Sequence, residues 1–395
     1  MKNNFFNIII PTRNRLVTLQ HSIKTVLNQN YDNYKIIVSD NYSNDGTKKF
    51  VESLNSEKIE YFNTGRSLSM SSNYEFALSK IKEGFVILIG DDDGLLPFAL
   101  KVLNEIINEE KALAISFCTA VYYWPGASPY EDLLLIPRTK KYVERRESSI
   151  FLEKLLNGSL DYSELPMLYT GGVVHSSLID KAKNSAGKFY HSFTPDVYSG
   201  IAIASVVKEY IRIERPIAIS GLSKFSNGQS QLGSNKDDSI AQAFFCENDI
   251  PFLTALGDGK VKSLHLLILE AYIQCGFLRK NEVVEMVRQF EIVVAKSQPN
   301  LRKEIEGYLR INCNFNPDSL SKSQIRIIAL RFKFYLRKKF AQLKRFLEWD
   351  VVFVKGQVSN VHEASEYVCN RSHGLMVTLF LRFEYIKSRL KRILR

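Results

Sequence analysis

Residues 85–97 read FVILIGDDDGLLP, an apolar run that ends in three consecutive aspartates. The uncharged, largely β-branched segment 86–89 predicts a buried strand that stops at Gly90. Three adjacent carboxylates repel one another, whereas a hard divalent cation prefers carboxylate oxygens as ligands. In open α/β sheets, ligands bind at the carboxyl ends of strands. The stretch therefore indicates either a metal site at a strand end or a solvated acidic turn.

Two earlier segments predict neighbouring strands. Residues 7–15 (NIIIPTRNR) are apolar and then basic, residues 16–29 have the period of an amphipathic helix, and residues 34–41 (YKIIVSDN) form a second apolar run. Strand, helix and strand in this order imply a right-handed parallel crossover. We therefore expect the polar residues that end the three strands to meet at one sheet edge: Arg13, Arg15, Asp40 and the three aspartates.

Three ordered motifs resemble the signatures of family 2 inverting glycosyltransferases with the GT-A fold. They are IIIPTRNR at 8–15, IIVSDNYSNDGT at 36–47 and GDDDGLLP at 90–97, and the resemblance covers roughly residues 5–105. It implies an α/β fold with a mostly parallel, nucleotide-sugar-binding GT-A sheet flanked by helices. It also implies a nucleotide diphosphate sugar as donor, with a UDP-sugar as the default.

The same resemblance implies roles for particular residues on the donor side. The segment Pro11, Thr12, Arg13 and Arg15 matches the first donor-binding segment of the family. Asp40 matches the carboxylate that binds the base, and Asn41 stands where a second acid is usual. Arg66 falls where donor contacts are frequent and suits a diphosphate or a base, although an exposed surface arginine is the alternative interpretation.

The acidic turn is expected to hold Mg²⁺ or Mn²⁺. Counted back from Pro97, Asp92 falls on the metal-binding position of the family and Asp91 on its neighbour toward the ribose, while Asp93 is the second choice for the metal. The departing diphosphate gains negative charge as the glycosidic bond breaks, and a divalent cation offsets that charge as a Lewis acid.

An inverting transfer also needs a general base that removes the proton of the acceptor hydroxyl. The family places an acidic residue near the start of a helix about a hundred residues after the metal motif. Residues 194–204 (TPDVYSGIAIA) fit that description, so Asp196 is the candidate base. A plain first-turn aspartate facing the helix dipole is the alternative interpretation, and Glu164 and Asp161 are weaker candidates.

Length and composition predict one large domain with an appendage. We expect a GT-A domain over 1–225, with a nucleotide half (1–105) and an acceptor half (106–225), a loop and helical extension over 226–320, and a basic amphipathic helical tail over 321–395. The five cysteines are odd in number and contain no Cys-x-x-Cys, which favours a reducing compartment over a disulfide framework or a zinc site. Every apolar run is shorter than about 18 residues, so no spanning helix is predicted.

The positive charge is concentrated in the last fifth of the chain. Residues 321–395 contain 17 Lys and Arg against 5 Asp and Glu, whereas the whole chain has a formal net charge of +11. Apolar residues recur at helical spacing in two stripes: Ile328, Phe332, Leu336, Phe340, Leu343 and Leu347, and then Leu379, Phe383, Ile386, Leu390 and Ile393. Basic amphipathic helices of this kind suit an anionic membrane surface. Packing of the stripes on the catalytic domain is the alternative, and no nucleic-acid motif accompanies the charge, so nucleic acid is not expected as a partner.

These features together predict a metal-dependent inverting glycosyltransferase of the hexosyltransferase type that extends a cell-surface glycan on a lipid-linked acceptor. The basic tail would place it in the cytoplasm, peripheral at the inner face of the cell membrane. A catalytically inactive GT-A-like binding protein anchored by its tail is one alternative. A nucleotidyltransferase is another, although it normally needs a glycine-rich phosphate loop, and none follows the first strand.

Overall fold

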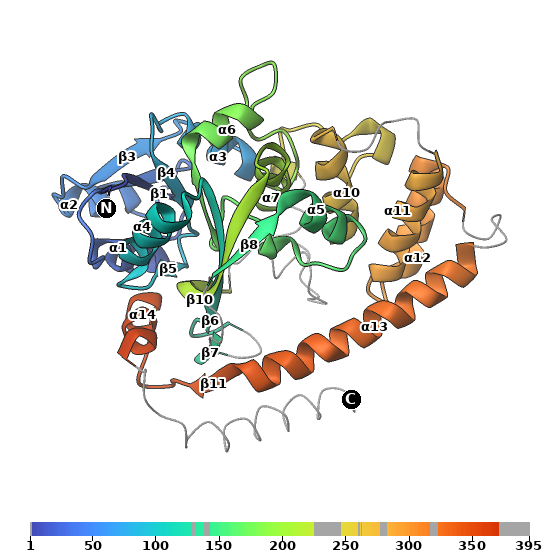
Figure 1. Cartoon of the computed structure of the whole chain (residues 1–395). Coiled ribbons are helices and arrows are strands. Elements are labelled where there is room, and N and C mark those ends of the chain that lie inside the picture. Colours follow the sequence, from blue (N-terminus) through green and yellow to red (C-terminus); the bar gives the residue numbers. More distant parts are fainter. Residues whose placement is uncertain are drawn as a thin grey trace.

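The computed structural model describes residues 2–127, 131–137, 143–224, 246–259, 261, 263–276, 283–316 and 323–370. These residues build a central mixed sheet covered by helices on both faces, and a group of helices beside it (Figure 1). The α/β class expected from the sequence is confirmed. Within the described part of the chain, every helix is too short or too polar to span a bilayer.

The nucleotide half is a parallel sheet with the order β3-β2-β1-β4. Its strands are β1 (Phe6–Thr12), β2 (Tyr34–Asp40), β3 (Ile59–Asn63) and β4 (Phe85–Leu88). The three strands predicted from the apolar runs are thus confirmed. β1 is buried along its whole length, which explains why its sequence, FNIIIPT, has an uninterrupted apolar centre rather than an alternating pattern. Thr12 pairs with Asp40 at the carboxyl edge, so the polar residues that follow these strands begin at the same level.

Helices cover both faces of this half. Apolar residues of α1, α2 and α4 pack into one core with the strands, and residues of α3 belong to the core on the opposite face. The bounds are α1 (Leu16–Leu27), α2 (Thr47–Ser53), α3 (Met70–Leu78) and α4 (Ala99–Glu110). The predicted helix over 16–29 is therefore confirmed, with its end two residues earlier.

The acceptor half continues the sheet with mostly antiparallel strands. β9 runs antiparallel to both β4 and β6, and the long β10 pairs in parallel with β6 and antiparallel with β5 and β8. The mostly parallel arrangement expected for the sheet thus describes the nucleotide half, and β9 reverses the direction beyond it. The strands are β5 (Gly94–Leu95), β6 (Ala114–Tyr123), β7 (Leu133–Pro137), β8 (Val143–Glu147), β9 (Gly172–His175) and β10 (Glu209–Leu222).

Helices of the acceptor half pack on the second face of the sheet. They share a core with α3 and with α10 of the extension. They are α5 (Ser148–Leu156), the single turn η1 (Tyr162–Glu164), α6 (Ser176–Ala182) and α7 (Pro195–Val206). This layer brings η1 and the start of α7 together behind the sheet.

The helical extension has a core of its own, built from α10, α11, α12 and the first half of α13. Its elements are η2 (Thr254–Leu256), α10 (Leu264–Gln274), α11 (Val283–Lys296), α12 (Arg302–Cys313) and α13 (Ser323–Glu348). Residues 225–245, which open the expected 226–320 region, lie outside the described residues.

The expected tail region returns to the main body. After α13, β11 (Trp349–Phe353) pairs antiparallel with β7, and α14 (Val361–Asn370) packs against α1 of the nucleotide half. Figure 1 shows α13 running from the extension back beneath the sheet to β11 and α14. Residues 321–370 are therefore part of the folded body as far as the structure describes them, while residues 371–395, with the second apolar stripe, lie outside it.

Candidate active site

The acidic turn, residues 90–93, joins β4 to β5 at the carboxyl edge of the parallel strands. All three of its carboxylates are buried, with exposed fractions of 1–3 %. Asp93 closes the turn: its Oδ2 accepts hydrogen bonds from the backbone N–H of Gly90 (2.9 Å) and from Thr170, and its Oδ1 accepts one from the N–H of Gly221 (2.7 Å). Both oxygens of Asp93 therefore tie the turn to the segment before β9 and to β10.

Asp91 connects the acidic turn to the first donor-binding segment. Its Oδ2 accepts a hydrogen bond from Thr12 Oγ1 (2.7 Å), and its Oδ1 lies 3.2 Å from Nη1 of Arg15 in an ion pair. Burial opposes the charge on Arg15, but Asp91 and Asp92 together raise its pKa above the ordinary value. The expected meeting of strand ends is thus realised for Thr12, Arg15 and the aspartates.

Asp92 lies between these two residues and is held from a third direction. Its Oδ2 accepts a hydrogen bond from Ser223 Oγ (2.7 Å), just after β10, and its backbone carbonyl accepts one from Trp124 Nε1 (3.0 Å). A side chain on Gly221 would place its Cβ 1.7 Å from that same carbonyl oxygen, so only glycine permits β10 to pass this close. Asp92 therefore has a fixed backbone position in the turn.

The electrostatics of the turn suit a bound cation. Burial, together with the charge of Asp92, raises the pKa of Asp93 to about 7, although hydrogen bonds from Thr170 and two backbone groups oppose the shift. Burial also raises the pKa of Asp91 to about 6, against the influence of Arg15. Arg15 alone thus leaves negative charge uncompensated in a buried place, which is the condition that a divalent cation relieves.

The ligand set also fits Mg²⁺ or Mn²⁺ bound partly through a substrate. Among the residues that the structure describes, no three His, Cys, Asp or Glu side chains surround a single point as a complete metal site would require. Mg²⁺ is commonly held by one or two carboxylates together with substrate phosphates and waters. Both oxygens of Asp93 close the turn, and Asp92 stays the predicted first choice for the metal.

The base-binding side of the site is centred on Asp40, which is fully buried at the end of β2. Its Oδ1 accepts a hydrogen bond from the N–H of Ser43 (2.8 Å), and its Oδ2 accepts from Tyr61 and from Asn63 Nδ2 (3.2 Å). Tyr61 and Asn63, on the neighbouring strand β3, therefore fix the carboxylate that the family resemblance assigned to the base.

Asn41 stands where a second acid is usual in the family, and its contacts show what the amide does there. Its Nδ2 donates to the carbonyl of Leu68 (2.8 Å), and its Oδ1 accepts from the N–H of the same residue (2.8 Å). An amide has both a donor and an acceptor, so it pairs with a backbone unit in a way that a carboxylate cannot. Asn41 thus pins the loop before α3 beside Asp40.

The other residues predicted for the donor side, Pro11, Arg13 and Arg66, are not among those that contact the acidic turn through the hydrogen bonds described above. Pro11 is buried within β1, whereas Arg13 is half-exposed and pairs with Glu247 at 2.8 Å. Arg66 is exposed on the loop between β3 and α3. The structure therefore brings Thr12 and Arg15 to the acidic turn, but it leaves Arg66 at the surface and Arg13 against the segment after residue 245.

The candidate base, Asp196, occupies the first turn of α7 directly after Pro195. Its Oδ2 accepts a hydrogen bond from the hydroxyl of Tyr162 (3.2 Å), which belongs to η1. Burial raises the pKa of Asp196, and hydrogen bonds from Val197 and Tyr162 offset part of this effect. A carboxyl with a raised pKa is a stronger base once it is ionised, which is the property that proton removal from an acceptor hydroxyl requires.

Two tyrosines that the sequence did not single out link Asp196 to the acidic turn. Burial raises the pKa of Tyr169 well above its usual value, and the charges of Asp93, Asp92 and Asp196 act in the same direction. The Tyr169 hydroxyl would lie 3.0 Å from a Cβ placed on Gly90. Tyr74, on α3, interacts electrostatically with Asp196 and with the acidic turn as well. Tyr169 therefore lies beside the acidic turn, and its pKa responds to the charge of Asp196 as well.

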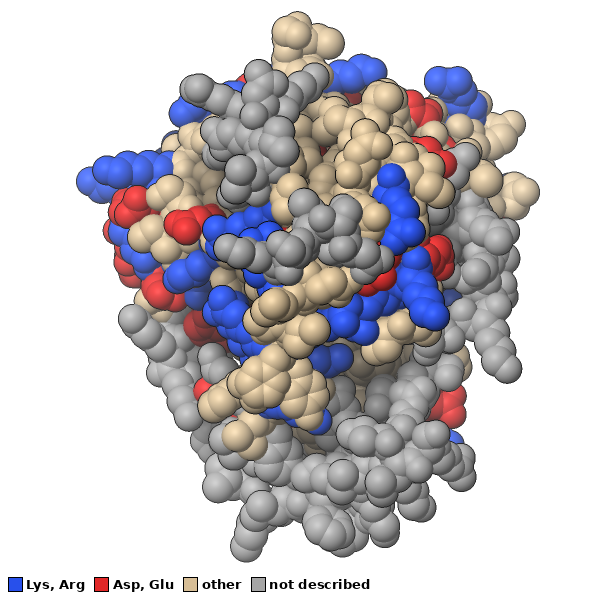
Figure 2. All heavy atoms as spheres, turned by 90° about the vertical axis from the view of Figure 1, so that its right-hand side faces the viewer, with Lys and Arg blue, Asp and Glu red and all other residues tan. Residues whose placement is uncertain are grey.

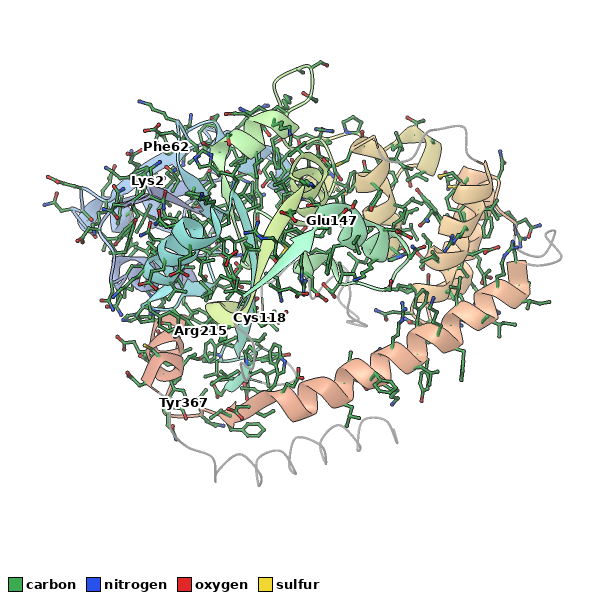
Figure 3. All side chains as sticks on the ribbon, in the orientation of Figure 1. Lys2, Phe62, Cys118, Glu147, Arg215 and Tyr367 are labelled. Carbon is green, nitrogen blue, oxygen red and sulfur yellow. The ribbon has the colours of Figure 1, made fainter. Side chains whose placement is uncertain are left out.

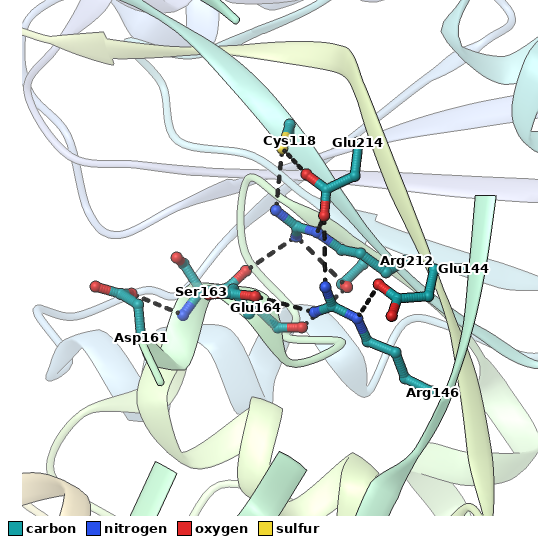
Figure 4. Close-up of polar contacts among 9 residues, drawn as sticks. Cys118, Glu144, Arg146, Asp161, Ser163, Glu164, Arg212 and Glu214 are labelled. Atoms are coloured by element: carbon teal, nitrogen blue, oxygen red, sulfur yellow. Dashed lines mark hydrogen bonds and ion pairs between the residues drawn. The ribbon is translucent and has the colours of Figure 1, made fainter. Parts of the chain in front are cut away.

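A buried arginine pair holds η1, and with it Tyr162, in place (Figure 4). Arg146 contacts Glu164 of η1 at 3.0 Å, Glu144 at 2.9 Å and Glu214 at 3.4 Å, although only 6 % of Arg146 is exposed. Its neighbour Arg212 donates to the carbonyl of Ser163 (3.4 Å). Glu164 is thus committed to an ion pair, while the exposed Asp161 caps η1 by accepting from the N–H of Ser163 (3.0 Å). Asp196, in contrast, acts together with the acidic turn on the pKa of Tyr169.

We expect Tyr162→Phe to shift the acid limb of the pH–rate profile upward. The hydroxyl donates to ionised Asp196 and lowers its pKa, so its loss raises that pKa further and more alkaline solution is needed to ionise the base. The measurement is kcat/KM against pH for both proteins. Tyr31→Phe is the matched control, because it removes a hydroxyl that donates to the Asn4 carbonyl, away from Asp196. An unchanged or lowered limb in Tyr162→Phe would contradict the role of Asp196.

The structure thus combines an α/β sheet with a buried acidic turn at the carboxyl edge of its parallel strands, as the motifs of the sequence led us to expect. Residues 7–154 match the family model of glycosyl transferase family 2. This segment of the chain, which contains the acidic turn and the predicted donor-binding residues, therefore matches a family 2 glycosyltransferase domain, as its motifs indicated.

Two curated relatives match part of the chain. The GalNAc(5)-diNAcBac-PP-undecaprenol beta-1,3-glucosyltransferase of Campylobacter jejuni subsp. jejuni serotype O:2 is 36% identical over 115 residues, which is 28% of this chain and 37% of the relative. WcaA of Escherichia coli (strain K12), named as a colanic acid biosynthesis glycosyl transferase, is 30% identical over 140 residues, or 35% of this chain and 50% of the relative. The chain thus spans between about a third and a half of the length of these relatives.

Solved structures resemble the chain at low similarity. TarS of S. aureus aligns with a TM-score of 0.45 and 15% identity over 83% of this chain and 54% of TarS. Residues 1–349 of TarS in complex with UDP-GlcNAc align with the same TM-score and 13% identity, over 86% of this chain and 92% of that one.

Proposed function

We propose that the protein is an inverting, metal-dependent glycosyltransferase that moves a sugar from a nucleotide diphosphate sugar, by preference a UDP-sugar, to a lipid-linked glycan acceptor. The observation that carries the proposal is the acidic turn itself: Asp91 contacts Thr12 and Arg15 of the donor-binding segment, and Asp92 lies next to them. The acceptor class follows from the Campylobacter relative, whose name describes a glucosyltransferase that acts on an undecaprenol-linked glycan. Assembly of a cell-surface polysaccharide agrees with the colanic acid role in the name of WcaA.

The donor would lie along the carboxyl edge of the parallel strands. Asp40 faces the base, with its orientation fixed by Tyr61 and Asn63, and the guanidinium of Arg15 is directed toward the acidic turn, where a diphosphate would approach. Asp92, with Asp93 as second choice, would hold Mg²⁺ or Mn²⁺, which supplies positive charge against the departing diphosphate. Thr12 and Arg15 keep Asp91 oriented toward this region.

Asp196 would act on the acceptor. Ionised, its carboxylate accepts the proton of the attacking hydroxyl as that oxygen forms the new bond to the sugar. Tyr162 holds the carboxylate by one hydrogen bond, and the Arg146 network fixes Tyr162 through η1. A base that acts from the face of the sugar opposite the diphosphate inverts the configuration at the reacting carbon.

The test is a panel of nucleotide sugars with the full chain, monitored by nucleotide release and by transfer to a polyprenyl-diphosphate-linked glycan. We expect a uridine diphosphate sugar to be turned over, with activity lost in EDTA and restored by Mn²⁺ or Mg²⁺. Donor binding without turnover under every condition would instead indicate an inactive binding protein. Release of pyrophosphate from nucleoside triphosphates would indicate a nucleotidyltransferase.

A further inference from the structure

One face of α13 exposes a continuous row of large apolar side chains. Along this 26-residue helix the exposed fractions reach 65 % for Phe332 and 74 % for Phe340. A soluble surface usually carries single apolar residues rather than a row of this length. The complete row, one helical face from end to end, comprises Ile325, Ile328, Phe332, Tyr335, Leu336, Phe340 and Leu343.

The exposure is not the result of a helix without tertiary packing. In the first half of α13 the opposite face packs into the core of the extension: Ile327 is fully buried, and Leu330 and Phe334 lie against the same cluster, whereas residues 335–341 are exposed on all sides. Arg326 and Ser323 both bind the buried Glu291 of α11, with Ser323 Oγ donating at 2.6 Å. α13 is therefore oriented by its inner face, and the outer row is presented outward. Figure 3 shows side chains of α13 projecting away from α11 and α12.

The row is accompanied by a strong positive charge. α13 contains eight Lys and Arg and one Glu, and Lys333, Arg337 and Lys338 are exposed beside the apolar row. Figure 2 shows Lys and Arg gathered across the middle of the face formed by the helical extension, with uncharged side chains among them. The partner of this face must therefore offer negative charge and an apolar phase together.

Among the candidate partners, an anionic lipid surface satisfies both requirements. A second copy would bring two positively charged helices together, and like charges at an interface oppose association. Nucleic acid would neutralise the charge, but its phosphate backbone provides no apolar surface that could bury the isoleucine and leucine side chains. A bilayer with anionic headgroups attracts basic residues and accepts an apolar helix face at the level of the acyl chains.

We propose that the outer face of α13 lies on an anionic membrane surface, with the helix parallel to the bilayer plane. At 1.5 Å per residue α13 extends for about 39 Å, which allows Ile325 and Leu343 to contact the same leaflet. This inference rests on the geometry and charge of α13 and holds whether or not the chain transfers sugar. The second apolar stripe, in residues 371–395, lies outside the described residues and is not needed for it.

The experiment is sedimentation of the full chain with vesicles, without donor or acceptor. We expect binding to vesicles that contain phosphatidylglycerol and little binding to pure phosphatidylcholine, with affinity that falls as salt rises because charge screening shortens to about 8 Å at physiological ionic strength. The double variant Phe332→Glu/Phe340→Glu should bind at least 10-fold more weakly. Ile311→Glu on α12, whose side chain is 81 % exposed, is the matched control and should bind normally.

A second variant separates the charge from the apolar row and guards against misfolding. Lys333→Gln/Arg337→Gln/Lys338→Gln leaves every apolar residue in place and should weaken binding about 100-fold. Each basic residue near an anionic surface contributes a factor of about five in affinity, and three such factors multiply. Circular dichroism reports whether each variant keeps its helices. The proposal would be overturned if the wild-type protein did not bind anionic vesicles. It would also be overturned if the double and triple variants of α13 bound them as tightly as wild type. Self-association that Phe332→Glu/Phe340→Glu abolishes, in the absence of vesicle binding, would replace it with a dimer interface.

Discussion

Replacing Asp92 by Asn is expected to lower the rate of sugar transfer by about 100-fold or more, and to weaken its response to Mn²⁺. The substitution removes one buried charge but keeps the size of the side chain and an oxygen that accepts from Ser223. A metal ion that polarises a departing phosphoryl oxygen contributes several kcal/mol to the transition state, and each 1.36 kcal/mol is a factor of about ten. The measurement is the initial rate of transfer at increasing Mn²⁺ concentration for both proteins.

Asp93→Asn provides the contrast in the same turn. Gly90, Gly221 and Thr170 all donate to the Asp93 carboxylate, and an amide would turn its own donors toward some of them. We therefore expect the free energy of unfolding to fall by about 1–3 kcal/mol, as is typical when buried polar groups lose their partners. If Asp92→Asn kept a near-normal rate and the same metal response, the assignment would move from Asp92 to Asp93.

Asp196→Asn is expected to lower the transfer rate by about 10²–10⁴-fold, the usual contribution of a general base. The asparagine still accepts the hydrogen bond from Tyr162 and has the same size, so the start of α7 should stay intact. Binding of uridine diphosphate, measured by calorimetric titration, should stay near the wild-type value because the carboxylate of Asp196 is held by Tyr162 of η1, on the proposed acceptor side.

Asp161→Asn is the control for this result. Asp161 is an exposed acid at the cap of η1, one residue before Tyr162, and it makes its hydrogen bond to the chain through an oxygen that asparagine retains. Its transfer rate should therefore stay within a few-fold of wild type. Weakened nucleotide binding together with preserved turnover in Asp196→Asn would assign Asp196 to donor binding or to structure instead.

The parts of the site that are adjacent along the chain or at strand ends were predictable. β1, β2 and β4 are mostly apolar because both of their faces are covered, and each predicted strand end carries the polar residues found at the sheet edge. The contact of Thr12 and Arg15 with Asp91 follows from parallel strands that end at one level. The local sequence pattern was sufficient here because the geometry of a parallel sheet then fixes which strand ends lie side by side.

The residues that join the acidic turn to Asp196 were not predictable in the same way. Tyr169 and Tyr162 approach the site through the antiparallel return of β9 and through η1, and neither element has a periodic apolar signal. The segment YTGG at 169–172, where a tyrosine and two glycines precede β9, is a signal that could have pointed there. The buried pair of Arg146 and Arg212 depends on contacts between β8, β10 and η1, which only the folded chain brings together.

The amphipathic period of α13 was visible in the sequence, but the sequence did not show which face of the helix packs against the core. The sequence offers two apolar faces, one through Ile328 and Phe332 and another through Ile327 and Phe334, and both fit a helix. Packing against α11 selects the second face for the core, which leaves the first exposed. Likewise, the pairing of β11 with β7 joins residues more than two hundred positions apart, beyond the reach of local patterns.

The position of α14 has a consequence for how the protein is made on the ribosome. Val361 of α14 is fully buried, close to Gly94 directly after the acidic turn, and Asn28 next to α1 donates to Glu366 at 3.4 Å. At about 5–20 residues per second, α14 is synthesised roughly 17–70 s after α1. During that interval the nascent nucleotide half lacks the helix that covers α1 and β5, so its apolar surface is open to chaperones and to misassembly. Maturation of the donor site should therefore be a late event, set by translation of residues 361–370 rather than by the early completion of the parallel strands.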